Sequence, residues 1–526
     1  MKRQRGRGRV LTGSGLGRVL AGAAALCAVV ALPGQALAAG EPAPYVFDTA
    51  AEPVSGSVST ADAPALTAGA TYKDSIGPKG KRYYRLDLDA KSNAYVSAVA
   101  VPRNGPKVGI GDGLKVSVLD RGNTSCDSGD NVGFGSAEFA RPISTYAART
   151  IEEGASSCQE AGTYYVLVER TTADGSAPDD WPLEIRYQSE PGLKTAGPTE
   201  APESWPSASP APPVGGPQKR HGGTGFNDAT GLDTGEWRDE IRPGQSLFYR
   251  VPLDWGQQIF SDIDLHSAVG TKNGFVGSAV SFDLYNPARG FVQAASSMSY
   301  DGKQKTAAMD PLPPVAYENR FTSSSGDGDM RLAGWYYLRV SLSPKVGTTF
   351  GDTAYGLTLR VSVKGDKGKG PAYAGTPGDF GVSDDDRDAA ARGQSGAQAA
   401  KSGTMKLVAG AGIGTGTVLV LALGVWTLLA RHRAAAAEGN PPHRNAQRPG
   451  APQQNVSPQN VSPQNVAPQN APQQNAPQQH PQYQHPQPAP GQAPQSTQYQ
   501  APQQTPQSAP QQQGPPQGYG PPPASW

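Results

Sequence analysis

An internal duplication is the feature that most constrains how this chain folds. YKDSI begins the first copy and WRDEI, 165 residues later, begins the second. The further matched segments occur in the same order, which is the signature of two copies of one domain. These segments are YYRLDLD (83–89) with FYRVPLD (248–254), AGTYYVLV (161–168) with AGWYYLRV (333–340), and LEIR (183–186) with LTLR (357–360).

The matched segments have the period of β-strands. Tyr84, Leu86 and Leu88 alternate with charged residues, so one face of the strand is apolar. Other short runs are rich in β-branched and aromatic residues, and Gly, Pro, Asn and Asp interrupt them. These runs are 95–101, 114–119, 164–168, 282–285, 335–340 and 355–363. We therefore expect an all-β fold with two tandem antiparallel β-sandwiches, repeat 1 (68–190) and repeat 2 (236–364).

Both copies resemble the pre-peptidase C-terminal type of β-sandwich, a group of jelly-roll-like accessory domains of secreted hydrolases. The chain resembles more closely the membrane-anchored C-terminal regions of actinobacterial proteins that carry a von Willebrand factor A domain. That resemblance extends through GGPQKRHGG (215–223), YDGKQK (300–305) and LPPVAYENR (312–320). A von Willebrand domain itself has no room here, since only about 30 residues separate the expected mature start, after residue 38, from the first strand. No DxSxS motif is present, so metal-dependent adhesion does not carry over to this chain.

An uncharged apolar run of 24 residues, 407–430, predicts one transmembrane helix. Arg431, His432 and Arg433 follow it and favour a cytoplasmic C-terminal side. The alternative is a buried core helix, although the run has no polar face. Two GxxxG pairs suggest helix packing into a homodimer, although glycine is also common in such helices. Their residues are Gly410, Gly412, Gly414 and Gly416.

Residues 1–38 have the pattern of a signal peptide. A basic start precedes an apolar run, and Ala36-Leu37-Ala38 forms a small-residue cleavage site. The alternative is an uncleaved membrane anchor. With a later span, a cleaved signal predicts a single-pass type I protein of the cell membrane, its N-terminal region extracellular.

Three segments outside the repeats have low-complexity composition. Residues 191–235 are Pro-rich and are expected to form a spacer, and residues 365–404 are expected to link repeat 2 to the membrane. The Pro/Gln-rich tail, 431–526, predicts cytoplasmic disorder. Whether the tail recruits a partner or serves as a spacer stays open.

Cys126 and Cys158 are the only cysteines of the expected extracellular region. Disulfides persist outside the cell, so we expect these two residues to pair and to stabilise the fold by about 3 kcal/mol. The alternative is a reactive thiol or metal pair, which no neighbouring histidine supports.

The extracellular region contains no recognisable catalytic motif. HExxH, paired CxxC and a phosphate-binding Gly-rich loop are all absent from the sequence. The two histidines of this region, His221 and His266, belong to no recognisable motif. The carboxylate pairs Asp179/Asp180 and Asp262/Asp264 are expected to be surface or turn residues. The triplet 384–386 is expected to be solvated, and the GDGD loop at 326–329 offers few of the oxygens that calcium needs. We therefore predict no catalytic residue, metal or cofactor, and a non-enzymatic protein.

The expected function is binding or scaffolding at the cell envelope. Candidate ligands are cell-wall glycan and an envelope protein, whereas the formal net charge of +1 argues against nucleic acid. The alternative is an accessory subunit that acts in trans with a secreted hydrolase or protease.

Overall fold

The computed structural model describes residues 42–437 apart from 153, 271 and 272. They belong to one compact unit that ends at Glu438. The predicted signal peptide (1–38) and the tail beyond residue 437 lie outside the described residues. In the long helix α4 (Gly396–Ala437), side chains are described for residues 396–401 and 417–433.

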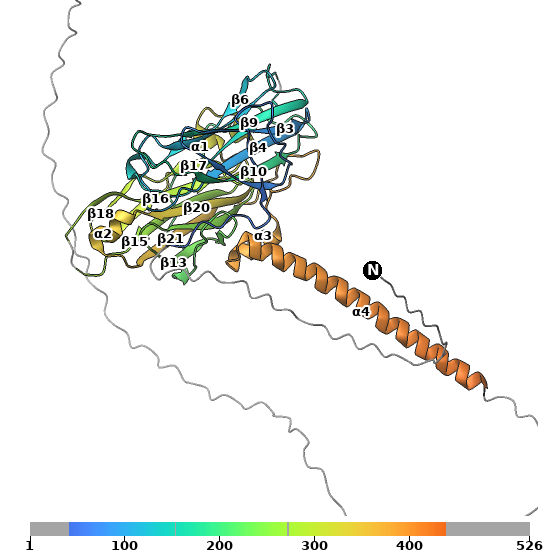
Figure 1. The fold of residues 1–526 in the computed structure, drawn as a ribbon. Coiled ribbons are helices and arrows are strands. Elements are labelled where there is room, and N and C mark those ends of the chain that lie inside the picture. Colours follow the sequence, from blue (N-terminus) through green and yellow to red (C-terminus); the bar gives the residue numbers. More distant parts are fainter. Residues whose placement is uncertain (1–41, 153, 271–272, 438–526) are drawn as a thin grey trace, which may run out of the picture. The chain divides into compact units, whose positions relative to one another are not determined.

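Repeat 1 consists of two sheets around a shared core (Figure 1). One sheet has the order β1-β2-β10-β4-β8, and the other has the order β3-β9-β5-β6, with β7 also on β5. Ile76 and Tyr84, one from each sheet, are fully buried in this core. The strands are β1 (Glu52–Pro53), β2 (Thr71–Ile76), β3 (Lys81–Leu88), β4 (Asn93–Ala100), β5 (Gly113–Leu119), β6 (Ser125–Ser128), β7 (Val132–Gly133), β8 (Ile143–Arg149), β9 (Gly162–Thr171) and β10 (Trp181–Glu190).

Repeat 2 has the same two-sheet arrangement. Its sheets have the orders β11-β13-β21-β15-β19 and β12-β14-β20-β16-β17, with β18 also on β16. Ile263 and Tyr336, one from each sheet, are fully buried in its core. The strands are β11 (Gln218–Lys219), β12 (Thr230–Gly231), β13 (Gly235–Ile241), β14 (Ser246–Leu253), β15 (Gln258–Leu265), β16 (Val276–Tyr285), β17 (Phe291–Ala294), β18 (Met298–Tyr300), β19 (Lys305–Ala308), β20 (Gly334–Leu342) and β21 (Tyr355–Lys364).

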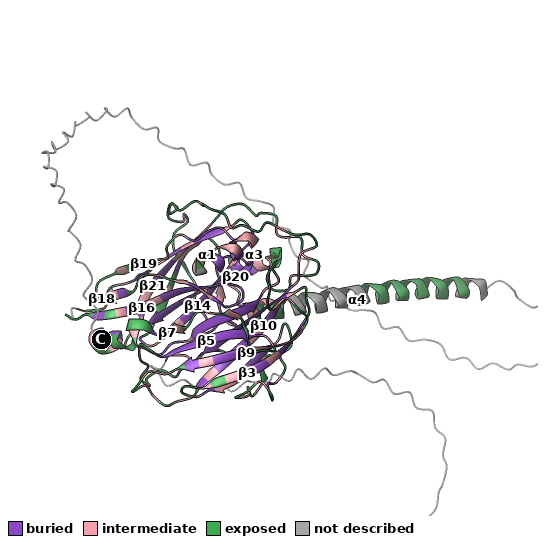
Figure 2. Ribbon diagram, turned by 90° about the horizontal axis from the view of Figure 1, so that it is seen from above, coloured by how far each residue is buried: buried purple, intermediate pink, exposed green. Residues whose placement is uncertain are grey.

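The structure confirms a predominantly β protein built from antiparallel sheets. The predicted alternation in β3 holds, since Tyr84, Leu86 and Leu88 are buried while the residues between them are not. Figure 2 shows this burial concentrated on the strands.

The duplication extends to hydrogen-bond detail. In repeat 1, the Asp74 carboxylate accepts bonds from the Tyr84 hydroxyl and the Gly56 amide, both at 2.7 Å. In repeat 2, Asp239 accepts the equivalent bonds from Tyr249 at 2.8 Å and Gly222 at 2.7 Å. The strands β1 and β11 also pair in parallel with β2 and β13 at matching positions. In each copy, a strand of only two residues therefore pairs with the sheet from a position upstream of the predicted start of the repeat.

Short helices lie in the connections between and after the strands. They are η1 (Gly135–Ala137), η2 (Tyr317–Phe321), α1 (Ser325–Gly328), α2 (Pro344–Phe350) and α3 (Asp384–Ala391). The acidic triplet 384–386 starts α3, where Ser383 and Asp386 form a reciprocal capping box, and its first two residues are exposed as expected. Ala389 and Ala390 of α3 are buried, so this segment packs against repeat 2.

Helix α4 contains the run predicted to cross the membrane. A search of the described residues found no helix with the length and apolarity that a membrane crossing requires. Residues 402–416, which include Gly410, Gly412, Gly414 and Gly416, lie outside the part of α4 whose side chains are described. The predicted glycine-mediated packing therefore stays a prediction.

Candidate functional site: a cleft between the repeats

The outward face of β10 is where the two repeats meet. Glu184, Arg186, Gln188 and Glu190 alternate with core residues and so point away from the core of repeat 1. Such polar side chains usually face solvent, yet Glu184 and Glu190 are fully buried. They are buried because repeat 2 and three connecting segments cover this strand.

Glu184 is the first anchor of the junction. It forms a buried ion pair with Arg289, from the turn between β16 and β17 of repeat 2. Its carboxylate also accepts bonds from the Asn227 side-chain amide at 3.0 Å and from the Asp48 backbone amide at 2.9 Å. Burial lowers the pKa of Arg289, but Glu184 outweighs this and leaves the pKa above its usual range. Three separate segments are thereby tied to one strand.

Glu190 is the second anchor. Arg320 of η2 pairs with it at 3.0 Å, and the Tyr373 hydroxyl donates to it at 2.7 Å. Asn93 and Tyr95 of β4 donate to its other oxygen at 2.6 and 2.8 Å. Burial alone would raise the pKa of Glu190, but these donors, Arg320 foremost, hold it below its usual range. The carboxylate therefore stays charged in the junction.

The expected spacers take part in this junction. Phe226 and Ala229, in the segment between the repeats, are buried. Beyond repeat 2, Asp379 accepts bonds from Arg186 and Gln188, and Phe380 packs on Tyr95 with ring centroids 5.3 Å apart. These parts of the two Pro- and Gly-rich segments are thus structural components of one body rather than free linkers.

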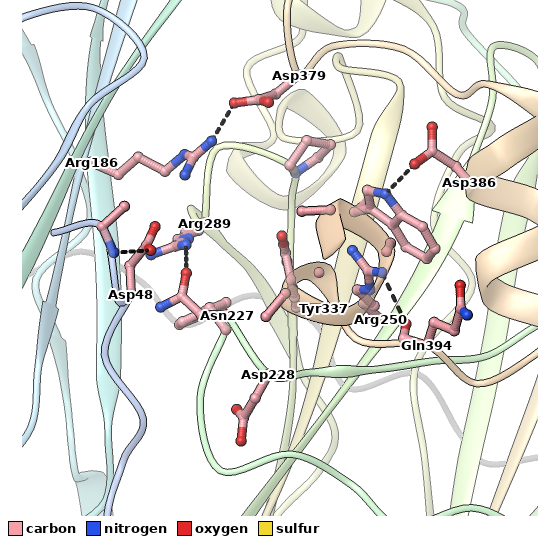
Figure 3. Close-up of a pocket in the computed structure, with 18 of the residues that line it drawn as sticks. Asp48, Arg186, Asn227, Asp228, Arg250, Arg289, Tyr337, Asp379, Asp386 and Gln394 are labelled. Carbon is pink, nitrogen blue, oxygen red and sulfur yellow. Dashed lines mark hydrogen bonds and ion pairs between the residues drawn. The ribbon is translucent and has the colours of Figure 1, made fainter. Parts of the chain in front are cut away.

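A cleft of about 820 Å³ opens at this junction. We call it the inter-repeat cleft. Seven segments line it: the N-terminal residues 46–50, strand β10, residues 226–228, strand β14, the turn at 287–289, strand β20 and residues 378–401. Figure 3 shows their side chains converging. A cavity of this size lies within the usual range for ligand sites.

Arg250 is the most deeply buried cation in the cleft apart from Arg289. Its guanidinium lies 3.8 Å from the centre of the Trp335 ring and donates to the Gln394 carbonyl oxygen at 2.9 Å. Trp335 in turn donates its ring N–H to Asp386 at 2.9 Å. Burial lowers the pKa of Arg250, although Tyr337 and Asp386 partly oppose that effect.

A smaller cavity of about 190 Å³ lies elsewhere between the repeats. There the Tyr146 hydroxyl of repeat 1 contacts Asp329 and Arg331 of repeat 2. Burial raises the pKa of Asp329 to about 6, even though Arg331 and Tyr146 oppose the rise. Asp329 belongs to the GDGD loop considered for calcium, but its carboxylate is occupied by these protein partners.

The other residues singled out in the sequence form bonds with other groups of the protein. Cys126 and Cys158 form the predicted disulfide, with Cα atoms 5.7 Å apart. His221 contacts Asp239, and His266 contacts Thr358. Asp262 and Asp264 both bind Arg360 at 2.6 Å. Within the described residues, no group of three or more metal-binding side chains comes together.

The residues that build the cleft were missed at the sequence level. Glu184, Arg186, Gln188 and Glu190 alternate with apolar residues, which indicates an outward polar face but not what covers it. Arg250 and Arg85 occupy equivalent positions in the two repeats. The sequence around Arg250 therefore does not indicate that its environment differs from that of Arg85.

Comparison with known proteins assigns this chain to no family. No family model matches the chain, and no curated protein matches it. Among solved structures, a chain of the complex of plant peptide RALF23 with FER and LLG2 is 10% identical, with a TM-score of 0.17 over 58% of this chain and 92% of that one. The CBM22 tandem domain of Xyn10C from Paenibacillus barcinonensis is also 10% identical, with a TM-score of 0.16 over 57% and 92%. Similarity this low supports no conclusion about fold or function.

Proposed function

We propose that this chain is an exported, single-pass membrane protein whose two repeats form one binding head at the cell envelope. The head would lie outside the cell, and the tail from Arg431 onward would lie inside. In this proposal the protein works by binding or scaffolding rather than by catalysis. Its ligand would be cell-wall material or an envelope protein.

The observation that carries the proposal is the apolar, uncovered surface of α4. Val418, Leu421 and Trp426 are 66%, 64% and 68% exposed, and their apolar neighbours along the helix are similarly uncovered. Contiguous apolar surface of this kind marks contact with lipid or protein. The uncharged sequence 407–430 and the basic residues that follow it favour a lipid bilayer as the cover.

One other feature supports display outside the cell, and a second supports ligand binding. The Cys126–Cys158 disulfide suits an oxidising compartment. The junction between the repeats depends on buried ion pairs, which hold the walls of the inter-repeat cleft in one arrangement. A pre-formed cleft loses little conformational freedom when it binds a ligand.

The binding function is tested with the full-length chain, purified in detergent. It is mixed with isolated cell wall and sedimented, and in parallel it is used as bait for solubilised envelope proteins. We expect specific capture in at least one arm. Capture in neither arm would reject the proposed binding role.

A further inference from the structure

The inter-repeat cleft contains a buried cation without an anionic partner. Among the described residues of repeat 2, the buried arginines Arg289, Arg320 and Arg339 each pair with a carboxylate. Arg250 is only 5% exposed, yet within the described part of the chain it makes no ion pair, and its Nε has no hydrogen-bond partner there. Its one hydrogen bond goes to a backbone carbonyl. A buried guanidinium gains most from a carboxylate, which accepts two parallel bonds from it.

Three of the carboxylates that line the cleft, Asp386, Asp379 and Asp228, are already engaged. Asp386 accepts bonds from Trp335 and from the amide and hydroxyl of Ser383. Asp379 binds Arg186 and Gln188. Asp228 accepts bonds from the backbone amides of its own turn. None of these groups is free to turn toward Arg250 without losing its own partners.

The start of α4 adds to the preference for an anion. Gly396 and Ala397 line the cleft at the positive end of the helix dipole. Ser395 and Gln398 cap this end reciprocally, so the helix start is well ordered. The guanidinium and the helix start therefore lie side by side in the lining of the cleft, where an ideal Cβ on Gly396 would be 3.4 Å from an Arg250 guanidinium nitrogen.

The lining of the cleft favours a peptide over a sugar ring. Its walls combine the aromatic side chains of Phe47, Trp335 and Tyr337 with backbone and charged groups. Arg250 covers one face of Trp335, so that face cannot stack on a sugar. A cleft of this volume accommodates a short extended segment with its side chains.

We propose that the inter-repeat cleft binds an acidic peptide, with a carboxylate of the peptide docked on Arg250. This inference rests on the proposed extracellular binding function and names the chemistry of its ligand. The peptide has two possible sources: the peptide stems of the cell wall, or an acidic segment of an envelope protein.

Calorimetric titration of the full-length protein tests this assignment. One probe is soluble peptidoglycan fragments, with carboxylates either free or blocked as methylamides. The other is a synthetic peptide of alternating Glu and Ala, compared with its Gln-for-Glu counterpart. We expect at least one free-acid probe to bind, and its neutral form to bind about tenfold more weakly or worse, as the loss of a charge-assisted bond implies. The probe that binds identifies the source.

The internal repeat supplies a matched control. Arg250→Met should weaken binding of the free-acid probe about tenfold or more. Arg85→Met changes the equivalent residue of repeat 1, which is half-buried beside Asp87 and does not line the cleft, and should leave binding unchanged. Melting temperatures establish that both variants fold. If Arg250→Met does not fold, the comparison of free and blocked probes decides the question.

Three results would overturn the inference: equal binding of free and blocked probes, normal binding by folded Arg250→Met, or no binding of either free-acid probe. Capture of cell wall or envelope protein that persists under any of them would leave the proposed function intact. Loss of capture altogether would reject both.

Discussion

At the scale of single residues, two glutamates on one strand decide how the repeats meet. Glu184 and Glu190 are fully buried, and each is neutralised by an arginine from repeat 2. A buried ion pair need not stabilise a fold more than apolar residues would, but removing one partner leaves the other charge uncompensated. The pairs therefore make the docking of the repeats specific.

Removing Arg320 tests this argument. Arg320→Met leaves Glu190 buried without its cation, and should lower the free energy of unfolding by about 3–5 kcal/mol. The control is Lys81→Met, which breaks an ion pair whose lysine is 56% exposed and should cost about 1 kcal/mol or less. Denaturant titrations measure both. Similar costs for the two variants would argue against the anchoring role of Glu190.

Asp329 makes the junction sensitive to pH. Because its folded pKa is raised to about 6, above the value near 3.9 in an unfolded chain, the folded state takes up a proton first. The associated stability is lost as pH rises through about 6 and is complete only below about 4. The melting temperature of the wild type, measured relative to Asp329→Asn, should therefore rise as pH falls from 7.5 to 5. A difference that does not change with pH would contradict this assignment.

At the scale of elements, the segments that connect the strands hold much of the fold together. The disulfide ties β6 to the loop before β9, and α3 is held to repeat 2 through Arg387 and Asp254 at 2.7 Å. These contacts add to the strand pairing within each sheet. They explain why segments with linker-like composition are ordered here.

The disulfide should contribute measurably to stability. It closes a loop with a sequence separation of 32 residues, so in the chain-entropy account its loss should cost about 3–4 kcal/mol. Denaturant unfolding of the Cys126→Ser/Cys158→Ser double variant, compared with the oxidised wild type, measures this cost. An unchanged midpoint would show that the unfolded state is not restricted by the bond.

At the scale of the whole molecule, the two repeats behave as one body in this account. Gly290, in the turn after Arg289, lies so close to Tyr146 of repeat 1 that an added Cβ would sit 2.1 Å from the Tyr146 ring. Gly290→Val should therefore act as a wedge and replace a single calorimetric transition with two. The matching turn of repeat 1 provides the control Gly122→Val, where the nearest atom is an Asp120 side-chain oxygen at 3.3 Å. Two transitions already present in the wild type would contradict a single rigid head.

The sequence predicted the features that depend on local or repeated patterns. It missed contacts between residues that are far apart in the chain. Alternation in β3 predicted its buried face, and two lone cysteines predicted their bond. The outward face of β10 has the same alternation as a solvent-exposed strand, so only the folded chain reveals that Arg289 and Arg320 cover it. Likewise, the Pro-rich composition of residues 191–235 gives no indication that Phe226, Ala229 and Leu232 are buried and anchor this segment.

Protease treatment of intact cells, with antibodies against the head and against the tail, tests the central claim most directly. If the head is displayed outside a single span, external protease removes or trims the head and leaves the tail antibody detecting a small membrane-bound fragment. Digestion of the tail with survival of the head would reverse the orientation and contradict the account. Protection of both, with full digestion after the membrane is permeabilised, would place the whole protein inside the cell and contradict it as well.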